Sequence, residues 1–217
     1  MTTPRDLLIV ATDMEAGRPL EQGELSLALA GAEVIDLLAA RTVLLDGDHI
    51  VPGDRPAPDD RLLAEAAGAI VREAPHESVA DWLWRRGRGL SAVYRARLEA
   101  DGQLVRPRRR GLSFRAGEAE LVDSAERSAA AERWASDDPV LATLAQALGV
   151  LPRGVRAADS PDLTDVTDVD DVTDVDDDAV ATVLATVSDA LVELAAVRQR
   201  RSVEEAAFDN IWRGSGG

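Results

Sequence analysis

Arginine is concentrated in one part of this acidic chain. The segment Arg85–Arg115 holds ten arginines but only two acidic residues, Glu99 and Asp101. The whole chain has a net charge of -16, and all 24 of its basic residues are arginines. A guanidinium group donates paired hydrogen bonds to phosphate or carboxylate oxygens. Because local charge decides where an anion docks, this segment predicts contact with an anionic surface.

Two groups of arginines within the segment have different settings. The first group lies where Gly87 and Gly89 interrupt a predicted helix, and backbone N–H groups of the following helix are expected to help hold a phosphate there. The second group lies on a predicted hairpin strand whose far end carries two apolar residues. Basic side chains beside an exposed apolar tip are typical of an interfacial membrane contact. We therefore predict the lipid-binding residues Arg85, Arg86, Arg88, Arg108, Arg109 and Arg110, and the membrane-contact residues Leu112 and Phe114.

The same residues also fit a purely structural role. The arginines can form a solvated basic face that pairs internally with the surplus acidic residues, and Leu112 and Phe114 can be core residues of the hairpin. Trp82 and Trp84 fit a core or groove position better than a lipid anchor. The sequence leaves these alternatives open.

No pattern in the chain indicates catalysis or metal binding. His49 lies beside a hairpin turn, His76 follows Pro75 in a loop, and neither has a partner at metal-ligand spacing. The chain has no cysteine, no phosphate-binding loop and no nucleophile elbow. The acidic run Asp159–Asp178 lacks the central Gly and terminal Glu of a calcium-binding loop. We therefore predict a non-catalytic protein without a metal or cofactor.

Composition and periodicity predict a mainly α fold. Aromatic residues make up only 3% of the chain, so Leu, Val, Ile and Ala must build the core. Apolar residues occupy nearly all sides of a helix at 21–41, which predicts a buried central helix. Asp-Gly in 42–51, and the strand-prone residues of 104–122, predict two β-hairpins. Further helices are predicted at 3–12, 59–72, from 78 through 84, and at 90–100, 123–135, 138–148 and 179–201.

These elements predict a single helical domain at 1–151, with further segments after it. An acidic low-complexity linker covers 152–178 and is expected to be disordered, because its charges repel one another and it lacks bulky core residues. A helix at 179–203 is predicted to pack back on the domain, and 204–217 is predicted to be a flexible tail. The apolar stretch Leu7–Ala11 is too short for a signal peptide or a spanning helix, so a cytoplasmic location is expected.

Several segments resemble, in order and spacing, the Golgi phosphoprotein 3 family over roughly Pro4 to Leu151. They include Pro-Arg-Asp-Leu-Leu-Ile-Val-Ala from Pro4, Leu-Ser-Leu-Ala-Leu-Ala-Gly-Ala-Glu-Val-Ile-Asp-Leu-Leu from Leu25 and Leu-Asp-Gly-Asp from Leu45. The resemblance implies a mainly α, peripheral membrane protein that binds phosphatidylinositol 4-phosphate. It also implies that the second hairpin serves membrane insertion and self-association. The all-arginine composition favours a bacterial-type member.

The resemblance carries over only part of the family's lipid pocket. The pocket's Trp and an Arg of the same helix fall at Glu21 and Ala30 here, while two later basic positions fall at Arg88 and Ser91. Only Arg88 matches. The predicted partner is therefore anionic phospholipid, with phosphatidylinositol 4-phosphate included by resemblance. A homo-oligomer through the 104–122 hairpin and an unknown protein cargo are further expected partners.

Two other functions remain compatible with the same segment. The chain can be a protein–protein adaptor that self-associates through the hairpin. It can also be a winged-helix module whose wing, Arg108–Arg110, contacts nucleic-acid phosphate. The helix before that wing lacks a clear polar face for reading bases, and the chain is strongly acidic. Nucleic acid is therefore the less favoured partner.

Overall fold

The protein is mainly helical, as its composition predicted. The computed structural model describes residues 2–13, 20–105, 120–150 and 175–214. Two small antiparallel sheets accompany the helices of these residues. The helices are α1 (Thr3–Asp13), α2 (Gln22–Ala39), α3 (Arg61–Gly68), α4 (Val79–Arg86), α5 (Leu90–Ala100), α6 (Ala125–Ala135), α7 (Pro139–Ala147) and α8 (Val175–Gly214); the strands are β1 (Val43–Asp46), β2 (His49–Pro52), β3 (Leu104–Val105) and β4 (Glu120–Leu121).

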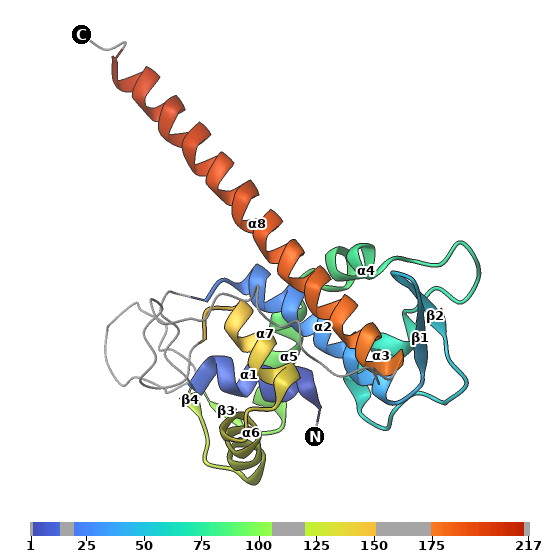
Figure 1. Ribbon diagram of the computed structural model, residues 1–217. Coiled ribbons are helices and arrows are strands. Elements are labelled where there is room, and N and C mark those ends of the chain that lie inside the picture. Colours follow the sequence, from blue (N-terminus) through green and yellow to red (C-terminus); the bar gives the residue numbers. More distant parts are fainter. Residues whose placement is uncertain (1, 14–19, 106–119, 151–174, 215–217) are drawn as a thin grey trace.

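The central position predicted for the second helix is confirmed. Helices α1, α3, α4, α5 and α8 all pack against α2, which lies in the middle of the body (Figure 1). Leu25, Leu29 and Leu37 of α2 are completely buried. Because almost every side of α2 is apolar, no side of it has to face water, and helices can pack around it. The core of the protein is therefore arranged about this one helix.

Both predicted hairpin pairings are present. Strands β1 and β2 pair antiparallel, with Asp46 opposite His49. His49 also forms an isolated antiparallel β-bridge with Ser78, which connects this hairpin to the start of α4. Strands β3 and β4 pair antiparallel, with Leu104 opposite Leu121. The connection between them, which contains Arg108–Arg110, lies outside the described residues.

The last helix is longer than the sequence analysis predicted. A helix was expected at 179–203 and a flexible tail after it, but α8 begins at Val175 and ends at Gly214. The residues after 203 include Glu, Ala and Phe and contain no Gly or Pro before Gly214, so nothing in them stops a helix. The first half of α8 crosses the body beside α2, and the second half projects well beyond it (Figure 1).

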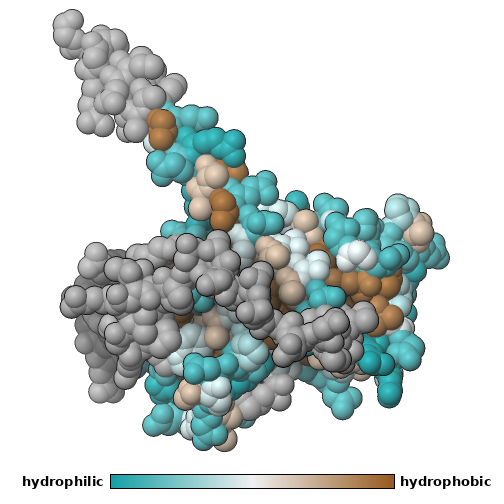
Figure 2. Space-filling view, viewed as in Figure 1, coloured by the Kyte–Doolittle hydropathy of each residue, from teal (hydrophilic) through white to brown (hydrophobic). Residues whose placement is uncertain are grey.

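Part of α8 is unusually apolar for a helix with so much exposed surface. The stretch Asp177–Glu204 is long and apolar enough to cross a membrane by length and composition, with a mean hydropathy of 1.8 and 22% of the window buried. Its inner face includes Val183, Val187 and Leu191, which are buried in the core. Val192 on the outer face is 70% exposed. Figure 2 shows apolar residues on the projecting part of α8 and on the body near the β1–β2 hairpin. The stretch Asp177–Glu204 of α8 therefore has one face buried in the core and another that exposes apolar side chains.

Gly31 of α2 permits the close approach of α8. A Cβ atom at this position would lie 2.3 Å from Cγ2 of Val187. Val187 is β-branched and buried, so its side chain cannot easily move aside. The absence of a side chain at Gly31 is therefore what allows the two helices to pack at this distance.

Gly31→Ala is expected to lower the free energy of unfolding by up to about 2 kcal/mol. Overpacking of a core costs about 1–3 kcal/mol, and the higher helix propensity of Ala offsets only about 1 kcal/mol of that. Chemical denaturation measures the change. Gly68→Ala in α3 is the control, because a Cβ there meets nothing within 4 Å and the substitution should be neutral or stabilising. Equal effects of the two substitutions would show that the α2–α8 contact is not tight.

Candidate functional site

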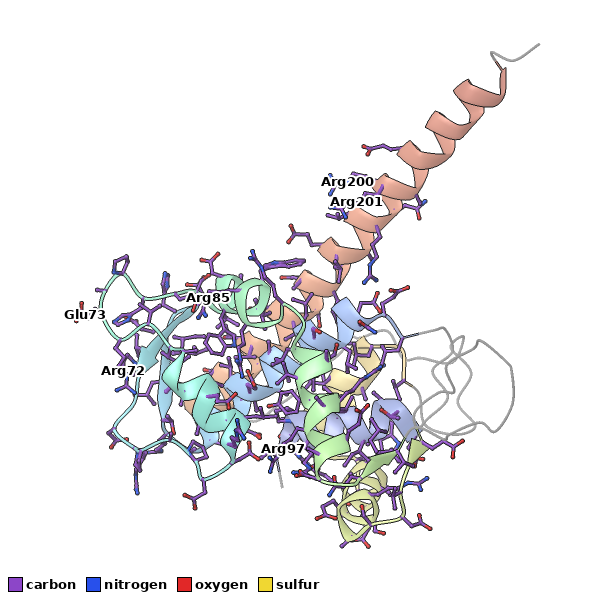
Figure 3. The ribbon with its side chains drawn as sticks, turned by 180° about the vertical axis from the view of Figure 1, so that it is seen from behind. Arg72, Glu73, Arg85, Arg97, Arg200 and Arg201 are labelled. Carbon is purple, nitrogen blue, oxygen red and sulfur yellow. The ribbon has the colours of Figure 1, made fainter. Side chains whose placement is uncertain are left out.

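Arg85, the first predicted lipid-binding residue, is held by the protein itself. Its Nε and Nη2 atoms each donate a hydrogen bond of 2.6 Å to the carboxylate of Glu77. Nη2 also donates to the carbonyl oxygen of Ala69, just after α3, at 3.2 Å. The guanidinium group lies 5.1 Å from the ring centroid of Trp82, which is completely buried. Arg85 therefore ties α4 to the end of α3, while about half of its side chain stays exposed (Figure 3).

The side chain of Arg86, unlike that of Arg85, points into the protein. Its Nε and Nη2 atoms each donate a hydrogen bond of 2.8 Å to Glu33 on α2, whose side chain is completely buried. The hydroxyl group of Tyr94 donates to the same carboxylate at 3.1 Å. Burial raises the pKa of Glu33 above its usual range, with Arg86 opposing it, and burial beside Glu33 also raises the pKa of Tyr94. The three residues form an internal polar network that joins α2, α4 and α5.

Arg88 differs from both neighbours because its charge is open to solvent. It lies in the turn between α4 and α5, where Gly89 has a φ of 73°. Its side chain is exposed, and no carboxylate in the described parts of the chain forms an ion pair with it. Of the three arginines predicted here, Arg88 is the one that presents an uncompensated positive charge to a ligand.

The expected phosphate contact through backbone N–H groups is wrong. The N–H of Ser91 donates to Oγ of Ser26 at 3.0 Å, and those of Leu90 and Ala92 donate to backbone carbonyls. The first turn of α5 is therefore already saturated by protein acceptors. Its closeness to α2, which the sequence did not reveal, supplies the competing hydroxyl group.

Arg95 is a candidate residue that the sequence analysis did not select. It lines a small open pocket of about 150 Å³ together with Gln22, Ser91, Ala92, Ala96 and Glu99. Arg95 is half-buried and has no acidic partner within the described residues. Arg95 lies in the second turn of α5, after the turn that contains Arg88 and Gly89. The local excess of arginine in Arg85–Arg115 is the signal by which the sequence could have identified it.

The positions equivalent to the family's lipid pocket are divided between the surface and the core. Glu21 is exposed at the start of α2, where its carboxylate lies 3.8 Å from Arg198. Ala30 is completely buried, and its carbonyl accepts a hydrogen bond of 3.2 Å from Nε1 of Trp82. The side chain of Ser91 donates to the carbonyl of Gln22 at 3.2 Å. Arg88, Ser91 and Glu21 therefore lie around the junction of α5 with the start of α2, whereas Ala30 is part of the core.

The remaining predicted residues add no second site. Arg108, Arg109, Arg110, Leu112 and Phe114 lie outside the described residues, so their assignment stays a prediction. Trp82 is a core residue and Trp84 is half-buried against the core, as expected. His49 pairs with Asp48 at 2.8 Å on the surface. Among the described ranges, no three His, Cys, Asp or Glu side chains gather in a way that could hold a metal ion.

Comparison with known families gives a match over most of the chain. The model of the family described as Golgi phosphoprotein 3 (GPP34) matches residues 4–194. The matched region extends from α1 into α8, so it covers the whole helical body. No curated protein sequence matches the chain.

Proposed function

Because the chain belongs to the Golgi phosphoprotein 3 family, we propose that it docks on anionic phospholipid through the turn between α4 and α5 and the hairpin that follows. Proteins of this family are non-catalytic and are peripheral membrane proteins on the cytoplasmic face. Family membership implies phosphoinositide binding in general. The family match over residues 4–194 is the observation that carries the proposal. We further infer a bacterial-type member from the arginine-only composition.

The local chemistry supports a positively charged docking surface at Arg88 and Arg95. Both side chains lack acidic partners within the described residues, although the chain contains 40 acidic residues. A basic residue near an anionic membrane contributes about 1 kcal/mol of attraction. Arg85 and Arg86 remain in the proposed site because they lie beside this surface. Their guanidinium groups are bound by Glu77 and Glu33, respectively. Arg88 and Arg95 supply the open charge.

The second part of the proposed surface is the hairpin between β3 and β4. Arg108, Arg109 and Arg110 are proposed to contact headgroups, and Leu112 and Phe114 to enter the apolar region of the membrane. The hairpin follows β3, which packs next to α5, and precedes β4, which packs next to α1. Because α5 also carries Arg95, the two parts of the surface are joined by one helix. Self-association through the same hairpin is the alternative use of this segment.

We propose general recognition of anionic lipid, with phosphatidylinositol 4-phosphate as one ligand. The family's pocket Trp and one pocket Arg correspond to Glu21 and Ala30 here, and Ala30 is buried. A carboxylate at Glu21 repels phosphate, so a tight, selective pocket at this place is disfavoured. Attraction through arginines does not depend on one headgroup. Binding should therefore follow membrane charge more than lipid identity.

Vesicle co-sedimentation tests the proposed function. The protein is expected to bind vesicles that contain phosphatidylserine or phosphatidylinositol 4-phosphate, and not vesicles of phosphatidylcholine alone. Binding should weaken steeply as the salt concentration rises, because the attraction is electrostatic. Duplex DNA is the second ligand in the same assay. Failure to bind either anionic vesicle would refute the proposal and leave the adaptor function, and preference for DNA would favour the winged-helix function.

A further inference from the structure

A second arginine-lined pocket lies on a different part of the molecule. It has a volume of about 230 Å³ and lies between the β1–β2 hairpin, the loop after β2 and α3. Buried apolar residues, including Val43, Ala67 and Ile70, form part of its wall. Arg55 from the loop and Arg72 from the chain after α3 line it as well. None of the residues that line the pocket is acidic.

The charges of both arginines are uncompensated. Arg55 and Arg72 are exposed, and neither forms an ion pair with any acidic residue that the structure describes. Elsewhere in the described chain, acidic residues hold arginines that link helices, such as Arg133 with Asp6 and Arg198 with Glu24. In a protein of net charge -16, two unpaired arginines on one pocket provide hydrogen-bond donors and positive charge for an anion.

The backbone that carries Arg55 is fixed in place. Its N–H donates to the carbonyl of Arg41 at 3.2 Å, and the N–H of Gly53 donates to the carbonyl of Thr42 at 2.9 Å. The hydroxyl group of Thr42 donates to the carbonyl of Pro56 at 2.9 Å. A Cβ atom on Gly53 would lie only 2.2 Å from the carbonyl oxygen of Arg41, so this approach requires glycine. The pocket wall beside Arg55 is therefore preformed.

The opposite wall is fixed by α3 and its two ends. Asp60 caps the start of α3 by accepting hydrogen bonds from the N–H groups of Leu62 and Leu63. At the other end, Arg85 donates to the carbonyl of Ala69, between the pocket residues Gly68 and Ile70. Arg72 follows directly after this held segment, and Figure 3 shows it beside the strands of the first hairpin. Both arginines therefore emerge from anchored backbone.

We propose that this pocket binds a phosphate group through Arg55 and Arg72. Two guanidinium groups offer paired N–H donors that match the several oxygens of a phosphate, whereas a carboxylate has only two oxygens. The pocket is smaller than a typical site for a drug-sized ligand, which fits a single phosphate or phosphomonoester. This site is separate from the proposed membrane surface, because Arg88 and Arg95 do not line it.

Isothermal titration of the full chain with inorganic phosphate, glycerol 3-phosphate and acetate tests the proposal. Arg55→Ala with Arg72→Ala should weaken phosphate binding about 100-fold, since each charge-assisted contact contributes about tenfold or more. Arg61→Ala is the matched control: Arg61 lies on α3, is exposed and does not line the pocket, so affinity should stay unchanged. Absence of phosphate binding, equal affinity for acetate, or an unaffected double variant would each overturn the proposal.

Gly68 offers a second pair of variants that keeps both arginines. A Cβ atom there meets nothing within 4 Å, so the fold should tolerate a side chain, and Gly68 lines the pocket. Gly68→Glu should weaken phosphate binding at least tenfold by placing a carboxylate at the pocket, whereas Gly68→Gln should have a much smaller effect. Equal effects of Glu and Gln would contradict an anion site.

Vesicles with and without phosphatidic acid distinguish a lipid phosphate from a soluble one. If the ligand is a lipid headgroup, the wild-type protein should prefer phosphatidic-acid vesicles to phosphatidylserine vesicles of equal charge, and the Arg55 and Arg72 double variant should lose that preference. If the ligand is soluble, the variant should lose only glycerol 3-phosphate binding. Variants of Arg88 report on the membrane surface independently. If those variants lose vesicle binding and keep phosphate binding, the membrane surface and the phosphate pocket are separate sites. Either proposal can then fail without the other.

Discussion

Arg86→Ala is expected to lower the free energy of unfolding by about 3–5 kcal/mol, because it leaves the buried carboxylate of Glu33 without its cationic partner. The Glu33 side chain is completely buried, and Arg86 supplies two of its hydrogen bonds. Tyr94 alone cannot compensate, since its single hydroxyl group is neutral.

The adjacent arginine provides the control for this effect. Arg85 also binds a carboxylate through two hydrogen bonds, but its side chain is 46% exposed. Arg85→Ala should therefore cost less than Arg86→Ala, about 1–2 kcal/mol, because this pair is only partly buried, with Glu77 12% exposed. Urea denaturation compares the two variants. Arg86→Met together with Glu33→Leu should recover much of the loss, because no buried charge then remains. Similar stabilities for the two single variants would contradict a structural role specific to Arg86.

Arg88→Glu combined with Arg95→Glu is expected to weaken binding to anionic vesicles about 1000-fold. Each reversal removes about 1 kcal/mol of attraction and adds repulsion of similar size, so the pair changes the binding free energy by about 4 kcal/mol. Neither side chain pairs with an acidic residue in the described chain, so the fold should tolerate both changes. Co-sedimentation at low salt measures the change, and circular dichroism checks the fold.

Arg97→Glu on the same helix is the matched control. Arg97 is exposed and pairs with Asp101 at 3.2 Å (Figure 3). It is two residues from Arg95, which places it on another side of α5. Its reversal should change vesicle binding by less than about tenfold, which corresponds to about 1.4 kcal/mol. If Arg97→Glu weakens binding as much as the double reversal, the attraction depends on net charge and not on the proposed surface.

Local sequence signals predicted most elements of the fold, because helices and hairpins begin and end through contacts between near neighbours. Ser78 accepts a hydrogen bond from the N–H of Asp81, and Asp138 accepts one from Leu141, as cap residues do. Gly47 and Asp48 form the turn of the first hairpin, between the paired residues Asp46 and His49. Helix α8 continues beyond the predicted end at 203, because the residues that follow permit a helix.

The partners of the arginines could not be read from local sequence. Glu33 lies 53 residues before Arg86 and 61 before Tyr94, so only the packing of α2 against α4 and α5 brings the three together. The same packing gives Ser26 as the acceptor for the N–H of Ser91. Tertiary contacts therefore decide that a carboxylate binds the guanidinium group of Arg86 and that no described carboxylate binds that of Arg88.

The sequence by itself determined a mainly helical chain with a buried central helix, two hairpins and a local excess of arginine, because apolar periodicity, caps and turn residues act over a few positions. Family resemblance extended this to a membrane-associated role. Only the tertiary structure decided which arginines are available, since a guanidinium group is neutralised by whichever carboxylate the fold brings to it. Folding places Glu33 and Glu77 against Arg86 and Arg85, and leaves Arg88 in a turn where no described carboxylate reaches it.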